Sequence, residues 1–555
     1  MGYVQAPSLV PLHPEVLEFF LSLESKLRSH MDDRKIGLTI FLLREDRISV
    51  FAEKLLRPNE AALIPLAEPL DGSFLPFPPA INRQPDWVQA VDSILTAPID
   101  QDMSSRSPGG LLVMRWRART FVLSFGYAWQ KLEDGWLELD FGLRVALNVI
   151  PRGELIEIKA EQIFAKWHLA SERAPRAASV NEFGVDFDRD LVAVIEGQQK
   201  SRPALGDRVR GSTSLRVNVA ITGIAELLDT CFTEFLSDAY RRNWPEIDKI
   251  SPLKDDVMIA LLEEQLDATL ADEVARRRVV MFTPYQRRGE SIVAESYVFG
   301  RMSSRPTTRP YLTIESWINE VARANDTPSV ALAKKYPVHI LESAEGESQS
   351  CKVFDCFGYE INDGAQVYIL SSGIWYEVVA DFVAQINQRI AQIPNCGLPL
   401  PRWNRTDDEG EYNTLCATNP SFLNCDARNF HFGGGHSQLE FCDLVHLDTR
   451  TLLFCKLVSK SSGMSHLLEQ VRRTSDLLFG VDGSYRARVL QLFEQHHPAA
   501  DVAWLRTRPR REDWNLCLVS LGKGSADLPF FAKCGLTKLA KELVERGHNI
   551  SFDAI

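Results

Sequence analysis

LEFCDLVH at residues 439–446 and LLFCKLV at residues 452–458 are the two stretches that decide how this chain is interpreted. Two apolar runs on either side of a short polar turn are typical of a β-hairpin. If a two-residue turn lies at residues 449–450, Asp443 stands directly opposite Lys456, and the two side chains share one face. Charged groups inside apolar strands are costly unless they bind each other or serve a purpose. The hairpin is therefore the first place to look for a functional site.

Two interpretations of this pair of charges stay open. It can be a structural ion pair, because opposite charges that face each other across two strands commonly stabilise sheets. It can also be chemical, with the acid binding Mg²⁺ and the lysine acting on an attacking water or a phosphate. The stretch MSHLLEQVRR at residues 464–473 follows at once and has the apolar spacing of a helix. A hairpin with a helix packed behind it is the layout of a metal-dependent site that cleaves phosphodiesters.

Composition sets wide limits. With 555 residues the chain is too long for a single hydrophobic core, so about two to four domains are expected. The ten cysteines are dispersed, with no CxxC pair and no zinc-type spacing to histidine. No N-terminal apolar segment and no apolar run of about 20 residues occurs. These features predict a cytoplasmic protein with reduced cysteines and no membrane partner.

The charge is unevenly distributed. The net charge of −12 argues against a protein that coats nucleic acid along its whole surface. Residues 401–555 nevertheless hold 19 basic and 19 acidic residues, so the first 400 residues carry the entire excess. The C-terminal arginines could contact phosphates, or they could be solvated surface groups. The candidates for nucleic-acid binding are Arg472, Arg473, Arg506, Arg508, Arg510 and Arg511.

The element order expected after residue 403 is distinctive. The expected elements are helix 408–417, strands 422–426, 439–446 and 452–458, helices 464–479 and 484–496, strand 515–520, helix 529–547 and strand 549–553. This α-β-β-β-α order, followed by a further strand, resembles the restriction-endonuclease-like core of the PD-(D/E)xK superfamily. We therefore expect a multidomain α/β (α+β) protein. Its regions are an N-terminal α/β domain at 1–170, a middle α+β region at 183–400 and a nuclease-like domain at 403–555, with the polar stretch 170–182 as a linker.

The resemblance assigns roles to particular residues. The superfamily places an acid on the second strand and a D/E-x-K motif on the third strand. Asp443 matches the first acid and Lys456 matches the lysine, whereas Phe454 stands where the second acid belongs. Mg²⁺ usually takes more than one carboxylate, so another acid has to supply the missing ligand. The candidates are Glu411 on the first helix, Asp426 at the end of the first strand, and Glu440.

Three further residues complete the candidate site. Glu440 lies three residues before Asp443, so strict alternation aims it at the opposite face unless a bulge turns it inward. Gln470 lies on the following helix, where related nucleases often hold a polar residue. His466 lies one turn earlier on the same helix face and could act as a general base or a phosphate donor. The alternatives are an ordinary helix start with a half-buried histidine, and a glutamine at the edge of the core.

Motifs along the whole chain carry a second resemblance. They are FVLSFGY at 121–127, DFGLRVALN at 140–148, FGVD at 183–186, GS at 211–212, WPEID at 244–248, GIWYEV at 373–378, EFCDL at 440–444 and SGMSHLLEQ at 462–470. Together they resemble a family of sporadically distributed bacterial proteins of unknown function. Members of that family are often met in mobile or phage-defence gene neighbourhoods. The resemblance implies a role in anti-phage defence and names no activity.

We therefore expect a bacterial defence protein whose C-terminal domain cleaves nucleic acid, DNA in preference to RNA, with Mg²⁺ or Mn²⁺. The metal ligands would be Asp443, Glu440 and Asp426. The acidic first 400 residues would restrain the activity, recognise a phage component, form a homo-oligomer or bind a partner from the same operon. The alternative is a non-catalytic sensor or scaffold that binds nucleic acid or a phage protein through a degenerate nuclease fold.

Overall fold

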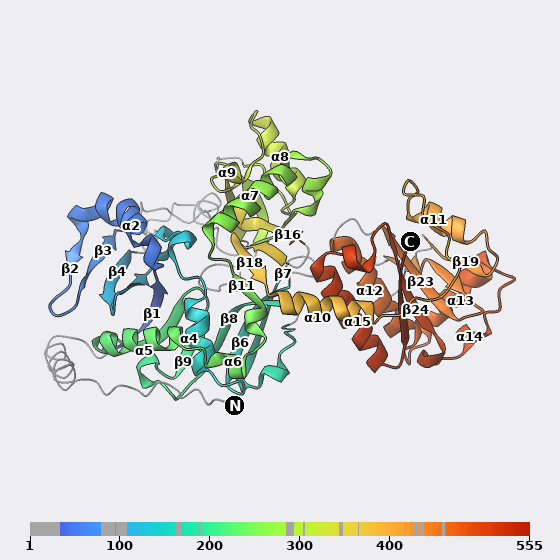
Figure 1. Cartoon of the computed structure of the whole chain (residues 1–555), viewed down its shortest axis with the longest axis horizontal. Helices are drawn as coiled ribbons and strands as arrows, with labels where there is room; N and C mark the ends of the chain where they lie inside the picture. Colours follow the sequence, from blue (N-terminus) through green and yellow to red (C-terminus); the bar gives the residue numbers. More distant parts are fainter. Residues whose placement is uncertain are drawn as a thin grey trace, which may run out of the picture.

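The structure is a computed structural model of the chain (Figure 1). It describes residues 34–78, 95, 108–162, 168–185, 187, 190–284, 294–302, 306–342, 348–363, 366–426, 430–431, 438–457 and 461–555. The protein is a mixed α+β, multidomain molecule with several sheets that follow one another along the chain. In the part of the chain described, no helix has the length and hydropathy needed to cross a membrane.

The first region is built on one sheet of ten strands in the order β2-β3-β4-β5-β1-β10-β9-β8-β6-β7, with every neighbouring pair antiparallel. The strands are β1 (Lys35–Leu42), β2 (Ile64–Pro65), β3 (Gly72–Phe77), β4 (Gly109–Trp116), β5 (Arg119–Phe125), β6 (Leu155–Gln162), β7 (His168–Ala178), β8 (Asp190–Gln198), β9 (Arg208–Gly211) and β10 (Leu215–Ala220). The α-helices are α2 (Ile48–Phe51), α4 (Phe141–Val149), α5 (Ile224–Leu236) and α6 (Tyr240–Asn243).

Strand β1 explains why this sheet has two cores. Its side chains alternate between faces, as in any strand, but apolar residues occupy both faces. Ile40 and Leu42 pack in the cluster that includes α4 and α5, whereas Phe41 packs with Phe51 of α2 in a separate cluster on the other face. All of these side chains are buried, so the strand is covered on both sides.

The expected linker at residues 170–182 is not a linker. Most of it forms β7, which pairs with β6 at the edge of the sheet. The polar composition that suggested a linker is that of an edge strand with one solvated face. Ser171, for example, donates a hydrogen bond to Glu157 at 3.3 Å. The boundary predicted between residues 170 and 183 therefore falls inside the first sheet.

The middle region contains a five-stranded sheet, β11-β18-β17-β16-β12, and a three-stranded sheet, β13-β14-β15. Their bounds are β11 (Ile250–Pro252), β12 (Val280–Met281), β13 (Ala294–Phe299), β14 (Pro337–Glu342), β15 (Ser348–Lys352), β16 (Phe357–Asp363), β17 (Gln366–Ser371) and β18 (Ile374–Val378). The helices are α7 (Asp256–Ala271), α8 (Ile314–Arg323) and α9 (Val330–Ala333). Trp317 and Phe357 meet edge to face in the core of this region, with ring centroids 5.5 Å apart.

Helix α10 (Ala380–Ala391) leads from the middle region to the C-terminal region (Figure 1). Phe382 of α10 packs against Phe530, the first residue of α15 (Phe530–Glu545), with ring centroids 5.6 Å apart. Glu360 in β16 accepts hydrogen bonds from the backbone N–H groups of Phe530 at 2.5 Å and Phe531 at 3.5 Å. Burial raises the pKa of the Glu360 carboxyl. The two regions therefore share a buried contact at the start of α15.

The C-terminal sheet has the order β19-β22-β23-β24-β25. Neighbours among the first three strands are antiparallel, and neighbours among the last three are parallel. The strands are β19 (Phe422–Asn424), β22 (Leu444–His446), β23 (Thr451–Leu457), β24 (Asn515–Leu521) and β25 (Asn549–Ala554), with β20 (Phe430–His431) and β21 (Gln438–Leu439) in a separate pair. The remaining helices are α11 (Glu409–Cys416), α12 (Ser461–Leu478), α13 (Ser484–His496) and α14 (Ala503–Arg506). The predicted strands 422–426 and 452–458 thus lie in one sheet with the last three residues of the predicted strand 439–446, and α12 packs on β23.

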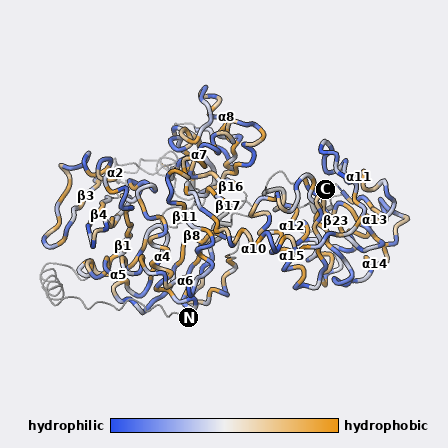
Figure 2. The backbone as a smooth tube through the Cα atoms, viewed as in Figure 1, coloured by the Kyte–Doolittle hydropathy of each residue, from blue (hydrophilic) through white to orange (hydrophobic). Residues whose placement is uncertain are grey.

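The two faces of this sheet bury different helices. Leu452 and Phe454 of β23 belong to the large cluster that contains α12, α13 and α15. Leu453 and Cys455 belong to a smaller cluster on the other face with α11. Apolar residues run along β23 and into the helices around it (Figure 2). This continuous hydrophobic pattern is typical of parallel strands covered on both faces.

The hairpin has a longer turn than the sequence predicted. His446 pairs with Thr451, so the loop has four residues, 447–450. The Arg450 N–H donates to the Leu447 carbonyl at 3.0 Å, and Arg450 is in the left-handed region with φ 51°. The register therefore differs by two residues from that of the predicted two-residue turn.

This register corrects the predicted partner of Asp443. The pairing of β22 with β23 ends at Leu444 and Leu453, one residue before Asp443. The Asp443 backbone N–H donates to the Leu453 carbonyl at 3.1 Å, and the Asp443 carboxylate accepts the Cys455 N–H at 2.7 Å. Asp443 therefore lies beside residues 453–455 of β23 and is not paired directly with Lys456.

Candidate functional site

Three carboxylates converge at the end of the C-terminal sheet where β19 ends and β22 begins. They belong to Asp426, Glu440 and Asp443, and one oxygen of each lies within 4.8 Å of the others. Asp443 is only 5% exposed, whereas Asp426 and Glu440 are half-buried. All three are residues that the sequence nominated as metal ligands. The structure brings them together from two separate segments of the chain.

Glu440 reaches the site because the chain between β21 and β22 is not a continuous strand. Residues 440–442 have no regular structure, and Asp443 is in a bend. Alternation of faces holds only within a strand, so the expectation that Glu440 points away from Asp443 does not apply. The Gln470 side chain on α12 donates a hydrogen bond to Glu440 at 3.2 Å. Gln470 thus orients one of the three carboxylates.

The Asp443 carboxylate is anchored by the neighbouring strand. Its Oδ2 accepts the backbone N–H of Cys455 at 2.7 Å. Burial raises the pKa of this carboxyl well above its usual range, and the nearby negative charges of Glu440 and Asp426 raise it further. The Cys455 N–H and the Lys456 ammonium act in the opposite direction. A cation bound among the three carboxylates would favour the charged form of Asp443.

Lys456 binds a residue that the sequence analysis did not consider. Its Nζ forms an ion pair with Oε2 of Glu409, the first residue of α11. The other oxygen of Glu409 accepts the backbone N–H of Leu457 at 3.0 Å. Lys456 was expected to pair with Asp443, but its ion pair is with Glu409. The sequence offered one indication of this contact: Glu409 lies in the first turn of the helix predicted at 408–417, just before the sheet.

Glu411 does not join the site. It closes the first turn of α11 in a capping box, in which its side chain accepts the Asp408 N–H at 2.9 Å. The Glu411 N–H in turn donates to the Asp408 side chain at 2.9 Å. Each side chain thus accepts the backbone N–H of the other residue, and both N–H groups would otherwise lack an acceptor at the helix start. Glu411 therefore caps α11 and is not one of the three carboxylates that converge.

Helix α11 nevertheless borders the site. A Cβ built on Gly410 would lie 3.1 Å from the Asp426 carboxylate, so the absence of a side chain lets α11 approach this acid closely. The Asp426 backbone N–H donates to Asn424 at 2.9 Å, which orders the chain just after β19. His466, by contrast, is exposed on α12, one turn before Gln470. Phe454, which stands in the expected acid position, is fully buried in the core.

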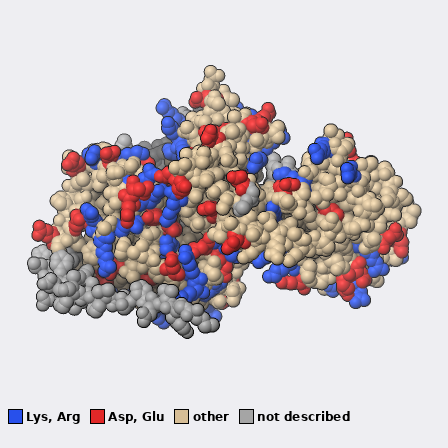
Figure 3. Space-filling model, in the orientation of Figure 1, with Lys and Arg blue, Asp and Glu red and all other residues tan. Residues whose placement is uncertain are grey.

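The nominated arginines are mostly engaged elsewhere. Arg472 pairs with Glu542 at 2.9 Å and with Glu469 at 2.7 Å, and Arg510 pairs with Glu512 at 2.7 Å. Lys and Arg side chains are interspersed with Asp and Glu over the face seen in Figure 3. These arginines are therefore partly neutralised, which weakens the case for a phosphate-binding surface.

Two other arginines hold the fold through backbone carbonyls. Arg508 Nε donates to the carbonyl of Phe479 at 2.8 Å, and Arg511 donates to the carbonyl of Arg546 at 3.4 Å. Phe479 directly follows the C-terminal end of α12, and Arg546 directly follows the end of α15. Four of the nominated arginines are exposed, namely Arg473, Arg506, Arg508 and Arg510, whereas Arg472 and Arg511 are half-buried.

The donor set indicates which ion the site suits. Three carboxylates with an amide beside them are hard oxygen donors, which Mg²⁺, Mn²⁺ and Ca²⁺ prefer. Mg²⁺ commonly uses one or two carboxylates and keeps several waters, so three converging acids are sufficient. A lysine at the rim of such a site can steady negative charge on a phosphate. The arrangement therefore fits a divalent cation.

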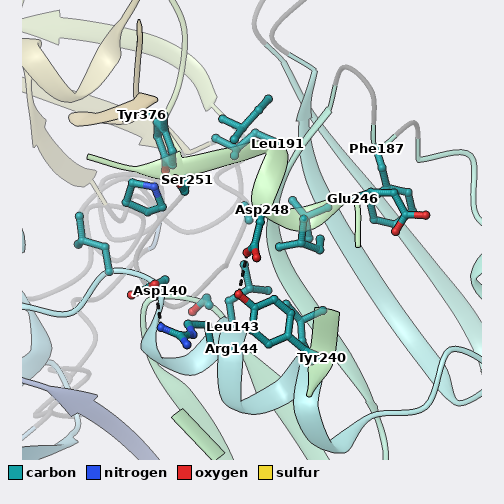
Figure 4. A pocket seen from close by; sticks show the side chains of 18 of the residues that line it. Asp140, Leu143, Arg144, Phe187, Leu191, Tyr240, Glu246, Asp248, Ser251 and Tyr376 are labelled. Atoms are coloured by element: carbon teal, nitrogen blue, oxygen red, sulfur yellow. Dashed lines mark hydrogen bonds and ion pairs between the residues drawn. The ribbon is translucent and has the colours of Figure 1, made fainter. Parts of the chain in front are cut away.

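A hollow lies between the first and middle regions, lined by residues of α4, α6, β8, β11 and β18 (Figure 4). Its charged groups are already matched to one another. Arg144 pairs with Asp140 at 3.8 Å, and the Tyr240 hydroxyl donates to Asp248 at 2.7 Å. Burial and the Asp248 carboxylate raise the pKa of Tyr240 to about 12. This hollow offers no charge or donor set that selects a ligand.

Comparison with known proteins places the whole chain in one group. A family model, described as a family of unknown function, matches residues 38–555 and so spans all three regions. No curated protein and no solved structure matches the chain.

Proposed function

The chain belongs to DUF6119, the family of unknown function whose model it matches, and we propose that its C-terminal region is a metal-dependent nuclease. The observation that carries the proposal is the convergence of Asp426, Glu440 and Asp443 within 4.8 Å. Lys456 adds a cation beside the three acids. The element order α11, β19, β22, β23, α12, then β24, supports a restriction-endonuclease-like core as its framework.

Each residue has a defined part in this proposal. Mg²⁺ or Mn²⁺ held by the three carboxylates would polarise a phosphate oxygen and lower the pKa of a water. Asp443 is oriented by the Cys455 N–H, and Glu440 is oriented by Gln470, so two ligands are already positioned. Lys456 would leave Glu409 and stabilise the negative charge that grows on the phosphate during cleavage. Glu440 and Asp426 replace the acid that Phe454 displaces from the third strand.

The experiment is a cleavage assay on the full-length protein. Single-stranded DNA, double-stranded DNA and RNA are incubated with Mg²⁺, with Mn²⁺ or with EDTA. Asp443→Asn and Lys456→Ala should each lower the rate at least about 100-fold, the usual scale for removing a group that stabilises a transition state. Glu411→Gln is the matched control, because it changes an acid in the same region that caps α11 and should leave the rate unchanged. Cleavage that survives in both site variants would refute the proposal.

A binding function without cleavage is the second candidate. Two observations favour it. Glu409 neutralises the charge of Lys456, and Phe454, which stands in the expected acid position, is a buried core residue. In that case the protein would bind nucleic acid, or a phage protein, in a metal-dependent manner and release it uncut. Binding that needs Mn²⁺ and is lost in Asp443→Asn, with no product at any time, would support it over the nuclease.

Anti-phage defence is the biological setting that we propose for either activity, on the resemblance of the chain's motifs. The test is plating efficiency of a panel of phages on cells that express the wild type or the variants. Protection that is lost in Asp443→Asn and Lys456→Ala would tie defence to the carboxylate site. Protection that persists in both variants would show that defence does not need the carboxylate site, and it would favour the sensor or scaffold.

A further inference from the structure

A second set of potential metal ligands lies in the same region, away from the three carboxylates. The thiols of Cys396 and Cys517 and a carboxylate oxygen of Asp553 all lie within 4.8 Å of one another. They come from the segment after α10, from β24 and from β25. Their sequence separations match no zinc motif, so the spacing rules applied to the sequence could not detect them.

The sheet itself brings two of these groups together. In the parallel pairing of β24 with β25, Cys517 pairs with Ser551, so Asp553 is the next residue on the same face. The segment that holds Cys396 is tied to β25 by a hydrogen bond from the Phe552 N–H to the Pro394 carbonyl at 2.9 Å. The cluster is therefore positioned by the backbone on all three sides.

The charge of Asp553 has no counter-charge. This residue is only 9% exposed, and among the residues that the structure describes no ion pair to it is recorded. Its Oδ2 accepts only neutral donors, the Cys396 N–H at 2.8 Å and the Cys517 thiol at 3.4 Å. A largely buried carboxylate without a cation nearby costs free energy, and a cation bound to Asp553 would lower that cost.

We propose that Cys396, Cys517 and Asp553 bind Zn²⁺, with water as the fourth ligand. Thiolates select Zn²⁺ over Mg²⁺, which distinguishes this site from the three-carboxylate cluster. In tetrahedral coordination with Zn–S bonds of about 2.3 Å, two sulfurs stand about 3.8 Å apart, so the observed donors need only a small movement. Binding releases the two thiol protons to solvent, so the net charge of the cluster stays at −1 while the Asp553 carboxylate gains a direct bond to a cation. Cys396 is half-buried, which leaves a route for the ion and its water.

The consequence is structural. The ion would clamp the segment after α10 to the outer strands of the sheet, just before α11 opens beside the carboxylate cluster. This inference does not depend on the nuclease proposal, because it concerns different residues and a different class of metal ion.

The test uses the full-length protein purified under reducing conditions. Zinc content is measured after dialysis against Zn²⁺ and then against buffer, and Co²⁺ is titrated into the metal-free protein. Co²⁺ bound to thiolates gives a charge-transfer band in the near ultraviolet that carboxylate ligands do not give. The variants are Cys396→Ser, Cys517→Ser and Asp553→Asn. Cys416→Ser is the matched control, because Cys416 is a buried cysteine in the same hydrophobic cluster.

One zinc per chain and a cobalt–thiolate band are expected in the wild type, in Cys416→Ser and in Asp443→Asn. Both cysteine variants should lose the band and bind Zn²⁺ at least about tenfold more weakly, and Asp553→Asn should also weaken binding. If Cys517→Ser fails to fold, the half-buried Cys396→Ser decides the result. Absence of the band in the wild type overturns the inference, as does an intact mass that shows a Cys396–Cys517 disulfide. Equal zinc affinity in Cys396→Ser overturns it as well.

Discussion

A hydrogen bond joins Asp443, the residue just before β22, to Cys455 in the neighbouring strand β23. The Asp443 carboxylate accepts the Cys455 backbone N–H at 2.7 Å, where a continuous strand β22 would have placed a carbonyl. A side chain thus continues the hydrogen bonding of β23. This bond also fixes the orientation of a buried carboxylate beside Glu440 and Asp426.

Asp443→Asn should change stability in opposite directions without and with metal. Without metal, asparagine keeps the oxygen that accepts the Cys455 N–H and removes one of three clustered negative charges, so the free energy of unfolding should rise by about 1 kcal/mol. Added Mn²⁺ should then stabilise the wild type and leave the variant unchanged. Thermal unfolding with and without Mn²⁺ measures both effects. Mn²⁺ stabilisation of equal size in the two proteins would rule out Asp443 as a ligand.

Glu409→Gln should strengthen nucleic-acid binding. Glutamine keeps an oxygen for the Leu457 N–H but no longer neutralises Lys456. We expect affinity to increase several-fold and the salt dependence to steepen by about one phosphate contact. Fluorescence anisotropy at several salt concentrations gives both quantities. The double variant Glu409→Gln, Lys456→Ala should cancel the gain, and a gain that persists there would show that Lys456 is not the phosphate contact.

Glu360→Ala should weaken the contact between the middle and C-terminal regions. The change leaves the Phe530 and Phe531 N–H groups at the start of α15 without their acceptor, at a cost of about 1–3 kcal/mol. Glu360→Gln keeps an acceptor and should cost less, so it is the matched control. Urea denaturation gives the free energies, and limited proteolysis near α10 reports whether the two regions separate. Equal losses in both variants would show that packing, and not hydrogen bonding, holds the contact.

His548 should make the protein less stable in mild acid. Its ring bonds to the Ser475 hydroxyl at 2.9 Å, and burial, aided by the charges of Arg511 and Arg546, lowers its pKa to about 4. A histidine in the unfolded chain titrates near pH 6.5, so the unfolded state takes the proton first as the pH falls. The contribution of neutral His548 is complete above about pH 6.5 and is lost between about pH 6.5 and 4, up to about 3 kcal/mol.

The variant His548→Gln should therefore show a shallower fall in the free energy of unfolding between pH 6.5 and 4.5. Urea denaturation across this range measures the slope. His466→Gln serves as the control, because it removes an exposed imidazole from α12. Slopes that change equally in the two variants would contradict an origin in the buried ring.

The sequence by itself determined the elements around the candidate site. The expected strands at 422–426 and 452–458 and the helix after them match β19, β23 and α12, because apolar periodicity is a local property of neighbouring residues. Of the expected strand at 439–446, only residues 444–446 join this sheet. Asp443 could be nominated because it is a charged residue inside an apolar run, whereas Asp426 and Glu440 were nominated because the resemblance to the PD-(D/E)xK superfamily left one acid position to fill. The polar edge strand β7 was missed because its composition is that of a linker.

Only the tertiary structure decided how these residues meet. The four-residue loop set the hairpin register, and the break before β22 turned Glu440 toward Asp443. The packing of α11 gave Lys456 its partner Glu409, and the pairing of β24 with β25 set Asp553 beside Cys517. Each of these contacts joins distant segments or depends on where a strand stops. Periodicity along the chain records which face a residue takes within one element, and it carries no information about which other element comes to lie against it.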